Sequence, residues 1–155
     1  MIRQLAFDLP RLDAMTRADF FVSPSNALAL GMVEDAAQWP LGRLLLVGPE
    51  GAGKTHLAHV RAAEAGARIV AGAGLADHDI AALSAGPVVV DDAEAVAGNP
   101  RDETALLHLV NFIAGNHPLL LTARTAPRDW GLGLADLISR LQATAVASLD
   151  PPDDA

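Results

Sequence analysis

The sequence has no cysteine and no tyrosine, and aromatic residues make up only 4% of its 155 positions. Without thiols the chain forms neither disulfides nor thiolate metal sites, which excludes a disulfide-stapled scaffold. With so few aromatics, the core has to be built from the aliphatic and alanine side chains that supply most of the 51% hydrophobic residues. The length is sufficient for one domain with a substantial core.

The sequence also lacks long apolar runs and an excess of basic residues. No run approaches the roughly 20 apolar residues of a membrane span, and the amino terminus has no apolar stretch typical of a secretory signal. The formal net charge of −8 argues against a surface built for the phosphates of nucleic acids. We therefore expect a cytoplasmic protein that has no membrane partner and acts on DNA only indirectly.

The most informative segment, residues 48–55, reads G-P-E-G-A-G-K-T and matches the phosphate-loop pattern G-x-x-x-x-G-K-[ST]. An apolar run of strand type, residues 43–47, precedes it, and residues 55–64 have helical composition. Glycines let several backbone N–H groups point at one anion, and the following helix directs its positive end to the same place. This context predicts that the chain binds ATP or ADP.

The residues expected to contact the nucleotide form one continuous stretch. Lys54 is expected to reach the β- and γ-phosphates, and the Thr55 hydroxyl to ligate Mg²⁺. The predicted nucleotide-binding residues are Gly48, Pro49, Glu50, Gly51, Ala52, Gly53, Lys54, Thr55 and His56.

Short apolar strands alternate with helices, a pattern that predicts an α/β protein with a parallel sheet covered on both faces. We expect a three-layer P-loop NTPase with a five-stranded parallel sheet in residues 24–155, preceded by a peptide and linker in residues 1–23. The expected strands are 43–47, 67–71, 87–91, 118–122 and 143–149. The expected helices are 24–39, 55–64, 77–83, 99–115 and 134–141.

Two carboxylates, Asp91 and Asp92, end the apolar run 88–90, where open parallel sheets bind their ligands. This is a Walker B pattern, in which Asp91 would hold Mg²⁺ and Asp92 would orient or deprotonate the attacking water. A pair of helix-capping residues is the alternative. Asp92 stands where vigorous ATPases carry glutamate, so we expect weak hydrolysis, and whether the chain is an enzyme stays open.

Taken in order, these motifs resemble the AAA+ ATPases related to the replication initiator DnaA. Residues 25–27 resemble the segment that this family places beside the nucleotide base. The resemblance implies that Thr122 senses the γ-phosphate and that residues 134–141 are the Box VII segment. Arg140 would then be an arginine finger, a catalytic cation for a nucleotide held by a neighbouring molecule. Otherwise Thr122 is an ordinary strand-end threonine and Arg140 a surface cation near a helix C-terminus.

The amino terminus also resembles a known recognition motif. Residues 4–10, Q-L-A-F-D-L-P, are similar to peptides that dock on the bacterial sliding clamp, with Gln4 as the hydrogen-bonding anchor and Leu5, Phe7 and Leu9 as apolar anchors. In isolation, a disordered tail or an added edge strand is the alternative. Ahead of a DnaA-like core, this peptide resembles the Hda family of DnaA regulatory inactivators, in its alphaproteobacterial form.

The resemblance implies a regulator of replication initiation with two partners, the DNA polymerase sliding clamp and DnaA. Such a protein stimulates ATP hydrolysis by DnaA, and because its relatives assemble edge to edge, a homo-oligomer is also implied. The alternatives are a DnaA-like initiator fragment or helicase loader acting on DNA, and a nucleotide-bound scaffold without turnover. Two departures stand out: we expect the family's helical lid to be absent, and residues 122–127 read T-A-R-T-A-P instead of T-S-D-R-P-P.

Overall fold

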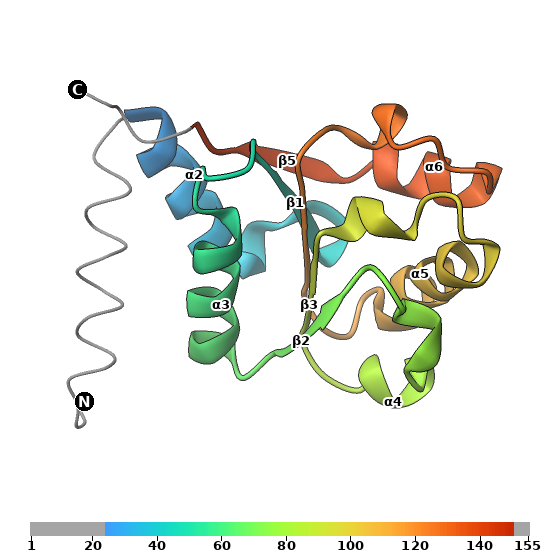
Figure 1. The fold of residues 1–155 in the computed structure, drawn as a ribbon. Helices are drawn as coiled ribbons and strands as arrows, with labels where there is room; N and C mark the ends of the chain where they lie inside the picture. Colours follow the sequence, from blue (N-terminus) through green and yellow to red (C-terminus); the bar gives the residue numbers. More distant parts are fainter. Residues whose placement is uncertain (1–23, 151–155) are drawn as a thin grey trace.

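A five-stranded parallel sheet with the strand order β2-β3-β4-β1-β5 is the centre of the computed structural model (Figure 1). The structure describes residues 24–150, so the predicted clamp peptide, with Gln4, Leu5, Phe7 and Leu9, lies outside the described residues. The strands are β1 (Arg43–Val47), β2 (Arg68–Ala71), β3 (Val88–Asp91), β4 (Leu119–Ala123) and β5 (Ala145–Ser148). The predicted α/β class and five-stranded parallel sheet are confirmed.

Helices cover both faces of this sheet. The α-helices are α2 (Pro24–Glu34), α3 (Lys54–Ala65), α4 (Ile80–Leu83), α5 (Pro100–Ile113) and α6 (Ala135–Gln142). Short 3₁₀ turns connect them: η1 (Ala36–Gln38), η2 (Pro40–Gly42), η3 (Leu75–Asp77), η4 (Ala93–Val96) and η5 (Pro127–Asp129). In Figure 1, α2 and α3 lie on one side of the sheet and α4, α5 and α6 on the other. Within residues 24–150, none of the helices combines the length and the apolar character needed to cross a bilayer.

The apolar strands divide their side chains between two cores. Leu44 and Leu46 of β1 belong to the cluster under α2 and α3, while Leu45 belongs to the cluster under α5 and α6. The same alternation holds in β4, where Leu120 faces the first cluster and its two leucine neighbours face the second. Since successive side chains of a strand point to opposite faces, burial on both sides explains the continuous apolar runs.

The first helix ends earlier than the sequence pattern predicts. A helix over residues 24–39 is expected, but α2 ends at Glu34. The Trp39 indole N–H donates a hydrogen bond of 2.6 Å to the Met32 carbonyl in the last helical turn, and the same carbonyl accepts the Asp35 N–H at 3.3 Å. Trp39 itself is extended, the conformation imposed by the following Pro40. The chain therefore turns through η1 and brings the indole back under the helix.

The helix expected over residues 77–83 is also shorter. It divides into η3 and α4, because the Asp79 side chain accepts the Ala82 N–H at 3.1 Å and caps a new helix start there. In contrast, the start predicted at Asn99 is confirmed, since its side chain accepts the N–H groups of Arg101 and Asp102.

Candidate nucleotide-binding site

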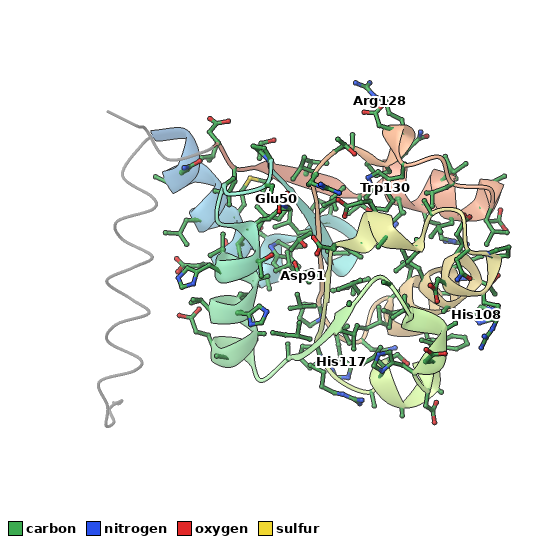
Figure 2. The ribbon with its side chains drawn as sticks, viewed as in Figure 1. Glu50, Asp91, His108, His117, Arg128 and Trp130 are labelled. Atoms are coloured by element: carbon green, nitrogen blue, oxygen red, sulfur yellow. The ribbon has the colours of Figure 1, made fainter. Side chains whose placement is uncertain are left out.

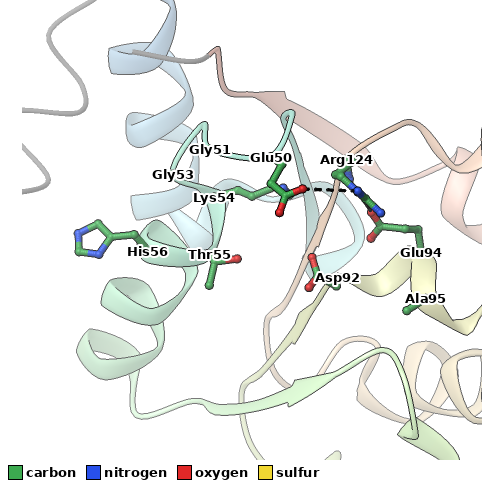
Figure 3. A pocket seen from close by; sticks show the side chains of 10 residues that line it. All are labelled: Glu50, Gly51, Gly53, Lys54, Thr55, His56, Asp92, Glu94, Ala95 and Arg124. Atoms are coloured by element: carbon green, nitrogen blue, oxygen red, sulfur yellow. Dashed lines mark hydrogen bonds and ion pairs between the residues drawn. The ribbon is translucent and has the colours of Figure 1, made fainter.

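A cavity of about 640 Å³ opens at the carboxyl ends of the strands, beside the loop between β1 and α3. The helix that follows β1 covers one face of the sheet, whereas η5 and α6, which follow the neighbouring β4, lie on the other. Such a switch point leaves a crevice between two loops, which is where open parallel sheets bind ligands. The cavity is lined by Glu50, Gly51, Gly53, Lys54, Thr55, His56, Asp92, Glu94, Ala95 and Arg124 (Figure 3).

The loop of residues 48–55 needs its glycines for two different reasons. Gly51 and Gly53 have φ angles of 88° and 98°, in the left-handed region that favours glycine. Gly48 lies so close to the end of β5 that a Cβ there would come within 2.7 Å of the Leu149 carbonyl oxygen. Helix α3 begins directly after Gly53, so its positive N-terminal end faces the cavity. The structure therefore has the backbone of an anion-binding loop.

The other predicted loop residues divide into cavity residues and supporting residues. Lys54 is only 6% exposed and forms no ion pair with any residue that the structure describes, so its ammonium group is available for phosphate. Ala52 is buried, and its N–H donates to the Pro49 carbonyl at 3.1 Å, which closes the turn. Thr55 faces the cavity, and His56 lines it with its ring pointing away from Asp92 and Arg124 (Figure 3).

Thr55 and Asp91 form an oxygen-only pair beside the loop. The Thr55 hydroxyl donates to both carboxylate oxygens of Asp91, at 3.3 Å and 3.2 Å. Mg²⁺ prefers oxygen ligands and typically takes only one or two from the protein, the others coming from water and substrate phosphates. The two side chains therefore fit the metal role predicted for them. Figure 2 shows Asp91 and Glu50 in the central part of the molecule, with Glu50 above Asp91.

Asp92 has an unusual backbone conformation, with φ 53° and ψ 54° in the left-handed region. Its exposed side chain lines the cavity. Partial burial raises the pKa of Asp92, and the carboxylates of Asp91 and Glu94 raise it further, against the opposing influence of nearby cations. A raised pKa suits a carboxylate that accepts a proton from an attacking water.

Thr122 lies below the cavity instead of lining it. Its side chain is fully buried, and its hydroxyl donates to Asp91 Oδ1. The hydroxyl oxygen of Thr122 accepts the Asp92 backbone N–H at 2.9 Å. The only hydroxyl proton is therefore directed at Asp91. In this arrangement Thr122 holds the Asp91 carboxylate and the backbone of Asp92.

Glu94 and Arg124 are cavity residues that the motifs do not predict. The Arg124 backbone N–H donates to Glu94 Oε2 at 2.9 Å, and its Nε lies 3.4 Å from the same oxygen. Nη1 of Arg124 also pairs with Glu50 of the phosphate loop at 3.7 Å. Only its position in the sequence could have indicated Arg124 as a cavity residue, because it directly follows the apolar run of β4 and the cavity opens at the carboxyl ends of the strands.

Arg140 lies away from this cavity. Its carbonyl accepts Nη2 of Arg43 and the Thr144 hydroxyl, both at 2.9 Å, and Arg43 is the first residue of β1. At about 3.3 Å per residue, the two ends of β1 are about 13 Å apart. The exposed Arg140 side chain forms no hydrogen bond or ion pair with residues 24–150. Burial and the nearby Arg140 guanidinium lower the pKa of Arg43.

In the segment predicted to lie beside the nucleotide base, residues 25–27, Asn26 makes a structural contact. The buried Asn26 accepts the Asp150 N–H at 2.9 Å and donates to the Asp150 carbonyl at 3.2 Å. These bonds fasten α2 to the chain that leaves β5, beside the phosphate loop.

Comparison with solved structures identifies the fold. Domain III of DnaA from Thermotoga maritima matches with a TM-score of 0.71 and 22% identity, covering 88% of this chain and 67% of that one. AMPPCP-bound DnaA from Aquifex aeolicus matches with a TM-score of 0.71 and 19% identity over 86% of this chain and 49% of that one. A RuvB mutant from the first organism matches with a TM-score of 0.53 and 24% identity, over 81% of this chain and 44% of that one.

These likenesses show the class of fold, the α/β fold of AAA+ P-loop NTPases that DnaA and RuvB also have. The chain spans about half the length of the replication initiation proteins that it matches, 48% of one and 49% of another. No family model matches the sequence.

Proposed function

We propose that this chain is a nucleotide-dependent regulator of replication initiation, of the type represented by Hda. It binds ATP or ADP with Mg²⁺ and docks on the sliding clamp through residues 4–10. It then stimulates ATP hydrolysis by DnaA through Arg140. The observation that carries this proposal is the position of Arg140: an exposed arginine, without an ion pair among residues 24–150, at the far end of β1 from the phosphate loop.

The cavity residues supply nucleotide binding. Backbone N–H groups of residues 48–55 and the Lys54 ammonium bind the phosphates, while Thr55 and Asp91 hold the metal ion. When bound, Mg²⁺ neutralises phosphate charge and orients the oxygens for displacement. Asp92 accepts the proton of the attacking water. Its side chain, shorter than the glutamate of vigorous ATPases, keeps turnover by this chain low.

Arg140 cannot serve the nucleotide of its own chain. Arg140 bonds to the first residue of β1, and the phosphate loop follows the other end of that strand, about 13 Å away. The like charge of Arg43 beneath it favours an outward orientation of the Arg140 guanidinium. An arginine supplied to a neighbouring active site increases phosphoryl-transfer rates by a factor of about 10³–10⁵. Arg140 therefore acts on a nucleotide held by another protein.

The decisive experiment measures ATP hydrolysis by DnaA in the presence of the DNA-loaded clamp and this chain. Arg140→Ala is expected to reduce the stimulation to the rate of DnaA alone. Arg128→Ala is the matched control, because Arg128 projects away from the fold (Figure 2) and its only ion pair within residues 24–150 is a weak 3.9 Å contact with Asp129. The proposal is wrong if Arg140→Ala stimulates DnaA as well as the unchanged protein does.

Clamp docking is tested separately with purified clamp. The double variant Gln4→Ala, Leu5→Ala is expected to abolish binding in the micromolar range, because it removes the polar anchor and one apolar anchor. The double variant Leu12→Ala, Asp13→Ala, which lies outside the peptide, should bind normally. Absence of binding by the folded, nucleotide-loaded parent protein would remove the feature that distinguishes a clamp-dependent regulator from other DnaA-like ATPases.

A DNA-acting ATPase, such as an initiator or helicase loader, is the second candidate. One matching structure is a replication initiator DnaA bound to AMPPCP and single-stranded DNA. This function requires robust turnover by the chain alone and salt-sensitive binding to DNA. The net charge of −8 weighs against it. A scaffold that only holds nucleotide would instead bind ADP tightly and be indifferent to Arg140→Ala.

A further inference from the structure

The buried arginine at the start of β1, Arg43, is bonded to the helix that carries Arg140. Its Nε donates to the Thr144 hydroxyl at 2.8 Å, and its Nη2 donates to the Arg140 carbonyl at 2.9 Å. The Thr144 hydroxyl donates to the same carbonyl, also at 2.9 Å. Three hydrogen bonds therefore join the first residue of β1 to the last turn of α6 and to the residue that precedes β5.

Arg43 has no acidic partner among the residues that the structure describes. It is only 6% exposed, yet the acceptors of its two hydrogen bonds are neutral oxygens. Within residues 24–150, no carboxylate forms an ion pair with Arg43 or with Arg140, although Asp136 precedes Arg140 by about one turn of α6. Arginine is rarely buried so deeply without an acidic partner. The energetic cost of this arrangement indicates that Arg43 does more than fill a position in the core.

Arg43 acts on Arg140 in two ways. Its hydrogen bond to the Arg140 carbonyl fixes the backbone from which the Arg140 side chain projects. Its positive charge repels the Arg140 guanidinium, so that side chain is not drawn back onto its own fold. Attachment of α6 to the sheet does not depend on Arg43 alone, because Leu137 and Leu141 of the same helix are already buried in the core. The effect of Arg43 is therefore directed at the orientation of Arg140.

We propose that Arg43 is a positioning residue for Arg140. Together with Thr144 it fixes the last turn of α6, so that the Arg140 guanidinium is presented to a nucleotide held by another molecule. Arg43 itself does not touch that nucleotide. Accurate placement is required, because a displacement of about 1 Å can cost about 100-fold in rate. This inference rests on the proposed function, and it adds two residues that lie outside the motifs of the sequence.

The test measures ATP hydrolysis by DnaA with the DNA-loaded clamp while the concentration of this chain is raised. Arg43→Leu is expected to lower the maximal stimulated rate by about 10- to 100-fold. The concentration that gives half-maximal stimulation should change by less than about threefold, because the lost effect belongs to the transition state. Arg43→Lys keeps the charge but loses the two-point contact, so its maximal rate should lie between those of the parent and Arg43→Leu.

Thr144→Val tests the same hydrogen bonds from their other side. Valine removes the hydroxyl that accepts Arg43 Nε and donates to the Arg140 carbonyl, so the maximal rate should fall as it does for Arg43→Leu. Thr144→Ser retains the hydroxyl and should resemble the parent. If Arg43→Leu fails to fold, Arg43→Lys and Thr144→Val decide the question in the same way.

Arg68→Leu is the matched control for loss of an arginine at the start of a strand. Arg68 begins β2 and donates to a helix carbonyl, that of Ala82 at 3.5 Å, but it does not contact α6. This variant should leave the stimulation unchanged. Damage to the whole fold would raise the half-maximal concentration and weaken the binding of AMPPCP with Mg²⁺, which calorimetry and thermal melts of each variant detect.

The possible outcomes separate this inference from the proposed function. A maximal rate that stays at the parent value in folded Arg43→Leu, or in Arg43→Lys and Thr144→Val, would overturn the positioning role and leave the proposed function in place. A maximal rate that falls in step with AMPPCP affinity would overturn it as well, because the effect would then belong to the fold. If Arg140→Ala stimulates DnaA as well as the parent does, the proposed function fails and the positioning role fails with it.

Discussion

The Thr122 hydroxyl donates a hydrogen bond to Oδ1 of Asp91, which joins the carboxyl ends of the neighbouring strands β4 and β3. The Thr122 hydroxyl oxygen in turn accepts the Asp92 backbone N–H at 2.9 Å. Asp91 also receives the Thr55 hydroxyl from the start of α3. One fully buried hydroxyl thus fixes two acidic residues against the phosphate loop.

Thr122→Val tests this arrangement, since valine keeps the shape and removes the hydroxyl. The Asp92 N–H loses its partner, so we expect a loss of about 1–3 kcal/mol in the free energy of unfolding. Nucleotide affinity should fall more in the presence of Mg²⁺ than in its absence, because Asp91 is no longer oriented. Urea denaturation and calorimetry measure the two effects. Thr122→Ser retains the hydroxyl and should resemble the parent; unchanged Mg²⁺ dependence in Thr122→Val would refute the positioning role.

Asp92→Asn is expected to make the protein more stable at neutral pH. Burial and two neighbouring carboxylates raise the folded-state pKa of Asp92 above the ordinary value of 3.8. Ionisation therefore disfavours the folded state, so the stability present below pH 3.8 is lost as the pH rises through the folded pKa. Asparagine carries no charge and tolerates the left-handed backbone at least as well.

The gain from Asp92→Asn should consequently shrink as the pH falls toward 3.8, leaving only a pH-independent backbone contribution. Denaturation curves at several pH values, recorded in parallel for Asp92→Asn and the parent, give this difference directly. A gain of the same size at every pH would assign the whole effect to the backbone. If Asp92 accepts the proton from water, the same variant should also lose its residual ATP turnover.

The parts of the site that could be predicted from the sequence are those formed by residues close together along the chain. The phosphate loop and Asp91 are recognisable because a strand, a turn and a helix follow one another within a few residues. The bridge between Glu50 and Arg124 is different. It exists because β1 and β4 are neighbours and their following helices cover opposite faces, which depends on the strand order of the whole sheet.

Two other differences depend on particular side-chain contacts. The periodicity that predicts a helix to residue 39 does not contain the local contact at the end of α2, in which the Trp39 indole bonds to the Met32 carbonyl. Similarly, the Thr122 motif predicts a polar residue at a strand end, but only the packed sheet turns its hydroxyl toward Asp91 and away from the cavity. Neither contact could be predicted from the type of the residue alone.

Gly72→Ala is expected to displace the backbone at Asp92 and so to distort the nucleotide-binding site. A Cβ at Gly72 would lie 2.4 Å from the Asp92 carbonyl oxygen, a distance that requires backbone movement. We expect a loss of about 1–3 kcal/mol in unfolding free energy, together with weaker nucleotide binding. Gly86→Ala is the matched control, because a Cβ there has nothing within 4 Å. Equal stability of the two variants would show that the backbone after β3 can move to accommodate a Cβ at Gly72 with little loss of free energy.

Glu103→Gln is expected to loosen the connection between α5 and α6, the helix that carries Arg140. Glu103 is only 4% exposed and accepts the backbone N–H groups of Gly98, Gly133 and Leu134 at 2.8–3.0 Å. Glutamine loses the charge and turns an amide donor toward one of these donors. We expect a loss of about 1.5–3 kcal/mol at neutral pH, the range for hydrogen bonds to a charged group.

The pH dependence identifies the cause of that loss. Burial alone would raise the pKa of Glu103, but the three N–H groups bind the ionised carboxylate and hold its pKa below the ordinary value of 4.5. A lowered folded-state pKa means stability that is present above pH 4.5 and lost as the pH falls through the folded value. The difference between Glu103→Gln and the parent should therefore narrow in acid. Glu50→Gln, which alters an exposed carboxylate, should have little effect at any pH. A penalty for Glu103→Gln that persists undiminished in acid would point to altered packing instead of the lost charge.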